Sequence, residues 1–283
     1  MRFGFVLPML RHRIEPTELP GLAITAEKNG FDSVWTADHI AVPQANSETY
    51  GDVIEQLVTL SYIAAKTEKL KVGTSVLVVP QRNPLLVAKQ AAALDILSGG
   101  RLILGVGAGW IEGEFRILGA DFAHRGRILD ESIQLMRAMW SEPVVNFSGT
   151  FFSVDDAVSF PKPKRQIPIW VGGNSDAALG RAARMGDGWH PIAVAPARVK
   201  EGREVIEKTG RKVTISTRSM VSIMADGTKA QAGLSGTRQH VVQQLEEYER
   251  AGAEYFLLQS GADDVASVAR DVLTFAREIL SSF

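Results

Sequence analysis

Short apolar runs and longer helix-periodic segments alternate along the whole chain of 283 residues. The runs lack the polar alternation of a half-exposed strand, which indicates strands buried on both faces of a parallel sheet. In the longer segments apolar residues recur every three or four positions, the pattern of a helix that covers such a sheet. The predicted strands are residues 3–8, 33–36, 70–79, 101–106, 167–172, 188–192, 213–224 and 254–259. The predicted helices are residues 16–29, 53–66, 84–97, 126–140, 176–185, 196–209, 237–251 and 263–280.

This alternation predicts an α/β fold, the (β/α)₈ TIM barrel. Eight strand–helix pairs can be counted, and eight is the number that closes such a barrel, which fills about 250 residues as one unit. We therefore expect one domain over residues 1–283. Residues 41–52, 143–168 (with a predicted hairpin) and 225–235 interrupt the alternation. Such segments are usually lids or binding loops, and we expect insertions at the C-terminal face of the strands.

Composition narrows the class of protein further. Lys and Arg number 31 and Asp and Glu 32, a formal charge of −1 that gives no broad cationic field for nucleic acid. The chain has no cysteine, and its five histidines lack the spacing of metal ligands, so we expect no disulfide and no metal site. No apolar stretch approaches the ~20 residues of a membrane helix, and the first residues do not resemble a signal peptide. We expect a cytoplasmic enzyme with a small-molecule substrate.

In a barrel of this class the active site forms at the C-terminal ends of the strands. Asp38 and His39 follow the second predicted strand. A histidine beside a carboxylate at such a place can be a general acid or base or can orient a cofactor ring, although a structural histidine fits this pair equally well.

Small residues follow the next two strands. They allow a flat ligand to approach the backbone closely, although ordinary loops have the same composition. The glycines after the fourth strand resemble a dinucleotide fingerprint only weakly, because they do not open a helix in an early βαβ unit. The candidate cofactor-binding residues here are Thr74, Ser75 and Val76 after the third strand and Gly105, Gly107, Gly109 and Trp110 after the fourth.

The turn after the fifth strand has the composition of an anion site. Gly172 and Gly173 end the strand, and Asn174 or Ser175 is suited to cap the following helix. Free N–H groups and the helix dipole would then converge on a phosphate, although a plain connecting turn is the alternative. Trp189 would lie beside the same pocket, unless it belongs to the core, where a strand tryptophan is more often found.

Taken together, these segments resemble the bacterial luciferase-like monooxygenase superfamily over nearly the whole chain. The resembling segments are residues 30–35 with Asp38 and His39, residues 73–76 with 82–84, residues 98–110, residues 168–173, residues 186–189 and residues 248–253. The resemblance implies a (β/α)₈ barrel that binds FMN or the deazaflavin coenzyme F420 at the C-terminal ends of its strands.

The order Trp35-x-x-Asp38-His39 is similar to the F420-dependent branch, so the resemblance favours coenzyme F420, with FMN as the alternative. In that branch a non-prolyl cis peptide backs the ring, and position matching puts it at Ser75-Val76. The sugar-phosphate dehydrogenases of the branch carry a glutamate where this chain has Trp110, which argues against a sugar phosphate as substrate.

We therefore predict an oxidoreductase that transfers a hydride between coenzyme F420 and a small organic substrate. His39 would transfer a proton or contact the ring, and Asp38 would orient His39. The alternatives are an FMN-dependent monooxygenase that receives reduced flavin from a partner reductase, and a non-catalytic carrier of deazaflavin or flavin. We also expect a homodimer and, as a possible partner, a reductase that supplies flavin or F420.

Overall fold

Eight parallel strands close into a barrel in the computed structural model, which describes residues 1–9, 14–224 and 233–283. Each strand pairs with its neighbour along the chain, and the pairing of the first strand, β1, with the last, β12, closes the ring. The barrel strands are β1 (Arg2–Val6), β2 (Ser33–Thr36), β3 (Lys71–Thr74), β5 (Leu102–Gly107), β8 (Ile169–Gly172), β9 (Gly188–His190), β10 (Thr214–Ile223) and β12 (Tyr255–Gln259).

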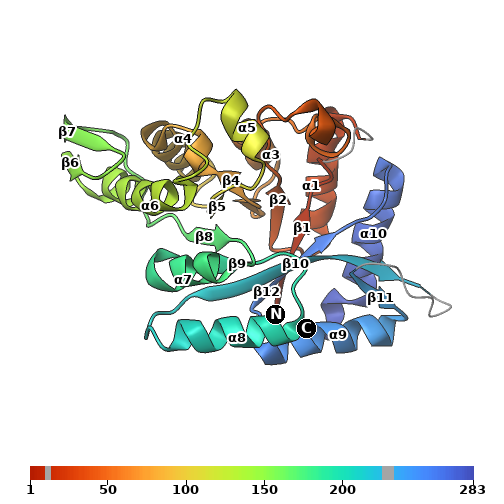
Figure 1. Ribbon diagram of the computed structural model, residues 1–283. Coiled ribbons are helices and arrows are strands. Elements are labelled where there is room, and N and C mark those ends of the chain that lie inside the picture. The colour runs from red at the N-terminus through yellow and green to blue at the C-terminus, as the bar shows by residue number, and fades with distance from the viewer. Residues whose placement is uncertain (10–13, 225–232) are drawn as a thin grey trace.

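Helices surround the barrel and bury their apolar faces against it (Figure 1). The eight predicted ones are present, and the (β/α)₈ prediction is confirmed. Helix α3 starts three residues later than predicted, because Glu55 accepts a hydrogen bond from the Val58 N–H and caps it there. These helices are α1 (Leu19–Lys28), α3 (Gln56–Lys66), α4 (Pro84–Leu97), α6 (Arg125–Ser141), α7 (Asp176–Met185), α8 (Pro196–Glu207), α9 (Arg238–Ala251) and α10 (Val265–Glu278).

Several short elements were not predicted. Helix α5 (Glu112–Ile117) is the next element after β5, and its Glu114 side chain is buried. No helix in the described ranges is long and apolar enough to cross a membrane. The short single-turn elements are η1 (Pro16–Glu18), η2 (Gln44–Asn46), η3 (Val79–Gln81) and η4 (Leu280–Ser282).

The third predicted strand, residues 70–79, is two strands in the structure. Strand β3 ends at Thr74 and the two-residue β4 (Leu77–Val78) pairs with β5. Between them the Ser75-Val76 peptide is cis, as the family resemblance implies. The chain leaves the regular sheet at these two residues and presents them to the space above the barrel.

Three glycines make room for this segment. A Cβ atom on Gly105 would lie 1.9 Å from the Thr74 carbonyl oxygen, and on Gly107 or Gly172 it would lie 2.5 or 2.6 Å from a Val76 methyl group. The sequence analysis predicted that a ligand approaches Gly105 and Gly107 directly. The structure corrects this prediction. These glycines are needed because the chain itself packs against them.

The interior of the barrel is filled by large aromatic side chains. Trp35 and Trp170 stack with ring centroids 5.1 Å apart, and both are almost fully buried. A Cβ on Gly73 or Gly188 would come within 2.4 Å of one of these rings, so small residues on the inner face admit the two indoles. A ligand can therefore be bound only above this layer, at the carboxyl ends of the strands.

The insertions lie in different places. Residues 41–52 follow β2 and carry α2 (Ser47–Tyr50) to the carboxyl face, as predicted. Residues 143–168 instead join α6 to the amino end of β8, so their predicted place at the carboxyl face is wrong. They contain the predicted hairpin, β6 (Val145–Ser148) and β7 (Ser153–Ala157), which packs beside α6 (Figure 1). Of the third segment, residues 225–232 lie outside the described residues, and β11 (Leu234–Gly236) is its described end.

Candidate active site

A cavity of about 570 Å³ opens at the carboxyl ends of the barrel strands. Nine of the fourteen predicted site residues line it: Asp38, His39, Ser75, Val76, Gly109, Trp110, Gly172, Gly173 and Ser175. The other five, Thr74, Gly105, Gly107, Asn174 and Trp189, are outside the lining and support it from behind or beside it. The strand-end rule therefore located the pocket.

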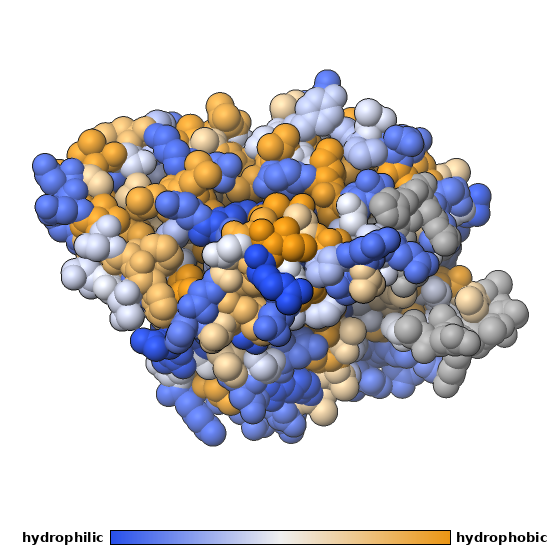
Figure 2. All heavy atoms as spheres, turned by 45° about the horizontal axis from the view of Figure 1, so that its top comes forward, coloured by the Kyte–Doolittle hydropathy of each residue, from blue (hydrophilic) through white to orange (hydrophobic). Residues whose placement is uncertain are grey.

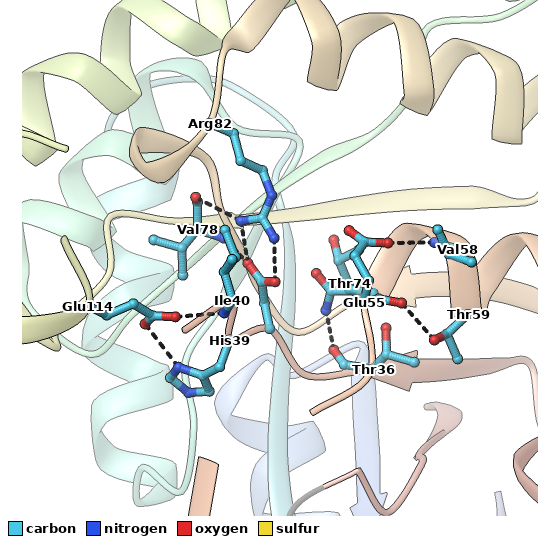
Figure 3. A network of polar contacts seen from close by, with 12 residues as sticks. Thr36, His39, Ile40, Glu55, Val58, Thr59, Thr74, Val78, Arg82 and Glu114 are labelled. Carbon is cyan, nitrogen blue, oxygen red and sulfur yellow. Dashed lines mark hydrogen bonds and ion pairs between the residues drawn. The ribbon is translucent and has the colours of Figure 1, made fainter. Parts of the chain in front are cut away.

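His39 is held by a buried carboxylate on a different element. Its Nδ1 lies 3.0 Å from Oε2 of Glu114 in α5, and the other carboxylate oxygen accepts the Ile40 N–H at 2.7 Å (Figure 3). Burial raises the pKa of Glu114, but the hydrogen bonds from His39 and Ile40 outweigh it and leave that pKa below its ordinary value. The ionised carboxylate fixes the Nδ1–H tautomer and leaves Nε2 free as a proton acceptor.

Asp38 does not have the role that the sequence suggested. Its carboxylate accepts two hydrogen bonds from Arg82, at 2.7 and 2.8 Å, and one from the Val78 N–H at 2.8 Å. A bidentate pair of this kind fixes the loop that follows β4. The prediction that Asp38 orients His39 is corrected: Glu114 occupies that position, and Asp38 braces the wall of the pocket.

The floor of the pocket is a chain of hydrogen bonds around Ser75. The Ser75 hydroxyl lies 2.8 Å from His190 Nε2 and accepts from Arg218 at 2.9 Å, and Arg218 also donates to the Ser75 carbonyl at 3.0 Å. Nδ1 of His190 lies 2.7 Å from the Ser216 hydroxyl, which donates to the Trp189 carbonyl. This donor order requires the Nδ1–H tautomer of His190, with Ser75 donating to Nε2. The network fixes the residue that begins the cis peptide.

Burial, followed by the charge of Arg218, lowers the pKa of His190 to about 3, and burial lowers the pKa of Arg218 to about 10. At neutral pH the imidazole is therefore neutral and the guanidinium is charged. His190 also stacks on Trp35, with ring centroids 5.4 Å apart, so the histidine joins the polar floor to the aromatic filling below.

This burial predicts an acid-sensitive fold. Because the folded-state pKa of His190 lies below its unfolded value near 6.5, its contribution to stability is complete above pH 6.5 and is lost as the pH falls toward 3. The loss is roughly 1.4 kcal/mol per pH unit for one such group. His190→Asn keeps a donor for Ser216 and does not titrate. Urea unfolding between pH 7 and pH 4 should show the gap in unfolding free energy between wild type and variant closing as the pH falls, and a constant gap would contradict the assignment.

The turn after β8 is built as the sequence suggested. Ser175 caps α7 by accepting the Ala178 N–H at 3.2 Å, and Gly173 adopts a φ of +125° that favours glycine. Asn174 instead bonds the backbone of Ile192 through both side-chain atoms, at 2.9 Å each, and so ties this turn to the loop after β9. Ala177 and Ala178, in the first turn of α7, line the pocket. The first N–H groups of a helix have no acceptor within the helix, and here Ser175 accepts the one of Ala178.

Two predicted contacts belong to the core. Trp189 is fully buried between β9 and α8, and its Nε1 donates to the Gly173 carbonyl at 3.0 Å. A Cβ on Gly202 would lie 2.0 Å from the Trp189 ring, so that helix passes directly over the indole. Because side chains alternate along a strand, the next residue, His190, is the one that faces the pocket. Thr74 is buried as well and donates to the Gly105 carbonyl at 2.6 Å.

The pocket carries an excess of positive charge. Arg181 pairs with Asp130, whereas Arg125 donates to the Gly109 and Phe122 carbonyls. Among the described residues neither Arg125 nor Arg218 has a carboxylate within ion-pair distance, and the Nε of Arg218 is buried without a partner. Two guanidinium charges are therefore available to an anionic ligand.

Sequence reasoning missed six polar side chains of the site: Tyr50, Glu114, Arg125, Arg181, His190 and Arg218. His190 lies in the middle of the predicted strand 188–192 and ends only the observed strand β9, so the strand-end rule did not select it. The others lie in an insertion, in helices or within a predicted strand, where no local pattern separates a site residue from its neighbours.

A family model described as luciferase-like monooxygenase matches residues 1–256. The chain belongs to the luciferase-like monooxygenase family. An F420-dependent glucose-6-phosphate dehydrogenase of Amycolatopsis mediterranei is 33% identical over 261 residues, which cover 84% of this chain and 77% of that relative. The resemblance inferred from the separate motifs is thereby confirmed.

Solved structures agree with this family member over nearly its whole length. An F420-dependent secondary alcohol dehydrogenase, determined with an F420–acetone adduct, is 22% identical and covers 98% of both chains with a TM-score of 0.84. A monooxygenase from Streptomyces bottropensis is 20% identical and covers 100% of this chain and 99% of its own, with a TM-score of 0.85. At such identities the likeness establishes the barrel fold.

Proposed function

We propose that this luciferase-like protein is an oxidoreductase that uses coenzyme F420 to transfer a hydride to or from a small organic substrate. The observation that carries the proposal is a single pocket that holds a proton-accepting histidine, an apolar wall and unpaired guanidinium groups. The 33% identity to an F420-dependent dehydrogenase and the order Trp35-x-x-Asp38-His39 support the same cofactor.

The residues of the pocket fit a flat ring with an anionic tail. The Val76 side chain provides an apolar surface and packs closely against Gly107 and Gly172. The hydrogen bond between Ser75 and His190 fixes the residue before it. The N-terminus of α7 and the Gly172–Gly173 turn would hold the phosphate of the tail, with Arg125 nearby in the same lining. When bound, a deazaflavin supplies the hydride chemistry, and the protein contributes position and electrostatics.

His39 is the group of this site that moves a proton. Its Nε2 accepts the proton of a substrate hydroxyl when the substrate is oxidised, and returns it in the reverse direction. Glu114 is the positioning residue, because its ionised carboxylate keeps the ring in one tautomer and stabilises the imidazolium that forms. The homodimer, the partner reductase and the cytoplasmic location stay predictions of the sequence.

The cofactor preference is tested by titrating the protein with F420 and with FMN and following tryptophan fluorescence. Trp110 lines the pocket, so binding of either ring should quench its emission. We expect F420 to bind at least tenfold more tightly, a difference of about 1.4 kcal/mol. FMN binding tenfold more tightly would overturn the proposal in favour of a flavin-dependent monooxygenase. Tight F420 binding without turnover of any alcohol or carbonyl compound would indicate the non-catalytic carrier.

A further inference from the structure

We infer that the amino end of the barrel carries a second binding site, for a small organic phosphate, in which Arg2, Arg211 and Lys212 hold the phosphate group. A cavity of about 580 Å³, here called the amino-end cavity, lies at these residues. It shares no lining residue with the candidate active site, so the inference is independent of the proposed function.

The amino-end cavity lies between α8, α9 and the beginnings of three barrel strands. Arg2 begins β1, Val213 directly precedes β10, and Glu254 directly precedes β12. In Figure 1 the marked N-terminus lies beside α8 and α9. Figure 2 turns the opposite end of the barrel toward the viewer and shows apolar residues gathered at its centre. By contrast, seven of the thirteen residues that line the amino-end cavity are charged.

Two of the three carboxylates in this lining are already paired. Arg203 donates to Glu207 at 2.7 Å, and the amino group of Met1 donates to Glu249 at 2.6 Å. Glu254 is the third carboxylate. These pairs cancel in charge, so the remaining groups of the lining decide the sign of the cavity.

The remaining groups have an excess of positive charge. Among the residues that the structure describes, Arg2, Arg211 and Lys212 have no carboxylate within ion-pair distance. Three cations beside the one carboxylate of Glu254 leave a net charge of +2. A phosphate monoester carries a charge of about −1.5 to −2 at neutral pH and matches this excess, whereas a single carboxylate carries −1.

Two of these cations are held in place before any ligand binds. The guanidinium carbon of Arg2 lies 4.8 Å from the ring centroid of the buried Tyr255. Arg211 donates through one nitrogen to the Ala183 carbonyl at 3.1 Å. A guanidinium presents five N–H donors in a fixed plane, so most of those of Arg211 remain available to phosphate oxygens. The structure therefore limits the side-chain entropy that binding costs.

Apolar side chains complete the lining. Ile206, Val213 and Ile215 face the amino-end cavity and are each less than 7% exposed. Pockets of about 300–1,000 Å³ that combine an apolar surface with a few polar groups are typical of small-molecule sites. The carbon skeleton of an organic phosphate would contact these three side chains while its phosphate contacts the cations.

The test is calorimetric titration of the full chain with phenyl phosphate and with benzoate, which differ in the anionic group alone. We expect phenyl phosphate to bind at one site with a dissociation constant below roughly 1 mM, and at least tenfold more tightly than benzoate. Lys212→Gln and Arg211→Gln should each weaken phenyl phosphate binding about tenfold. Lys200→Gln, an exposed lysine of α8 outside the cavity lining, is the matched control and should change the affinity less than twofold.

A further variant separates the two cavities. Arg125→Gln removes a cation from the candidate active site and should leave phenyl phosphate binding within twofold. Binding that is lost in Arg125→Gln and kept in Lys212→Gln places the phosphate in the active-site cavity and overturns the inference. Absence of saturable binding overturns it as well, and equal affinity for benzoate overturns the phosphate class.

Arg211 also has a structural contact, so its variant is accompanied by calorimetric melting. Loss of the bond to Ala183 lowers the melting temperature if Arg211 mainly supports the end of α7. Lys212→Gln then decides, because the Lys212 ammonium is exposed and no hydrogen bond joins it to a described residue. A folded Lys212→Gln variant with unchanged affinity shows that these cations serve only the fold.

Discussion

Replacing His39 by asparagine is expected to lower turnover about 10²- to 10⁴-fold, the usual contribution of a general acid or base. The asparagine amide nitrogen takes the place of Nδ1 and keeps the hydrogen bond to Glu114, whereas the proton-accepting Nε2 is lost. The melting temperature should therefore shift by no more than about 2–4 °C, the effect of 1 kcal/mol in a large domain. Stopped-flow reduction of F420 by the best organic substrate found, together with calorimetric melting, measures both quantities.

His124→Asn is the matched control. His124 also bonds a carboxylate through Nδ1, that of Asp121 at 2.6 Å, but this pair is exposed and outside the cavity lining. The control variant should keep the wild-type rate. If His39→Asn loses activity only in proportion to its loss of folded protein, His39 is a structural histidine and the proton has another acceptor.

Gly107→Ala is expected to weaken F420 binding at least tenfold while the barrel still folds. The new Cβ would lie 2.5 Å from Cγ2 of Val76, so that side chain has to shift, and space for a shift exists on its cavity side. An overpacked position of this kind costs about 1–3 kcal/mol of folding free energy, which a domain of ordinary stability survives. Fluorescence titration with F420 gives the affinity, and circular dichroism reports the fold.

Gly21→Ala in α1 provides the comparison, because a Cβ there meets nothing within 4 Å. That variant should bind F420 as the wild type does and be slightly more stable, since alanine favours a helix over glycine. Unchanged affinity in a folded Gly107→Ala variant would show that Val76 does not back the ring.

The fold followed from the sequence because both faces of each barrel strand are buried. An apolar run such as residues 254–259 can be satisfied only inside a covered sheet, and the helical period of its neighbours supplies the cover. The predicted elements were wrong where a local sequence pattern is compatible with two structures. Residues 70–79 are continuous in composition, yet the chain is interrupted at Ser75-Val76, because it must pass over Gly105 and Gly107.

The candidate site followed only in part. The strand-end rule led to His39, Ser75 and Gly173, because parallel strands bring all their carboxyl ends to one face. The direction of the side chains could not be predicted from the sequence. Trp189 and His190 are adjacent, and only the packing of α8 over the indole decides which of the two faces the cavity.

By itself, the sequence determined the barrel, the face that carries the candidate site, the family and the turn in which Ser175 caps α7. Only the tertiary structure decided the partners: Glu114, not Asp38, holds His39, and Arg218 reaches Ser75 from the far side of the barrel. The reason is physical. Secondary structure is encoded by neighbours in the chain, whereas a hydrogen bond between residues 75 or 143 positions apart exists only after the barrel has closed.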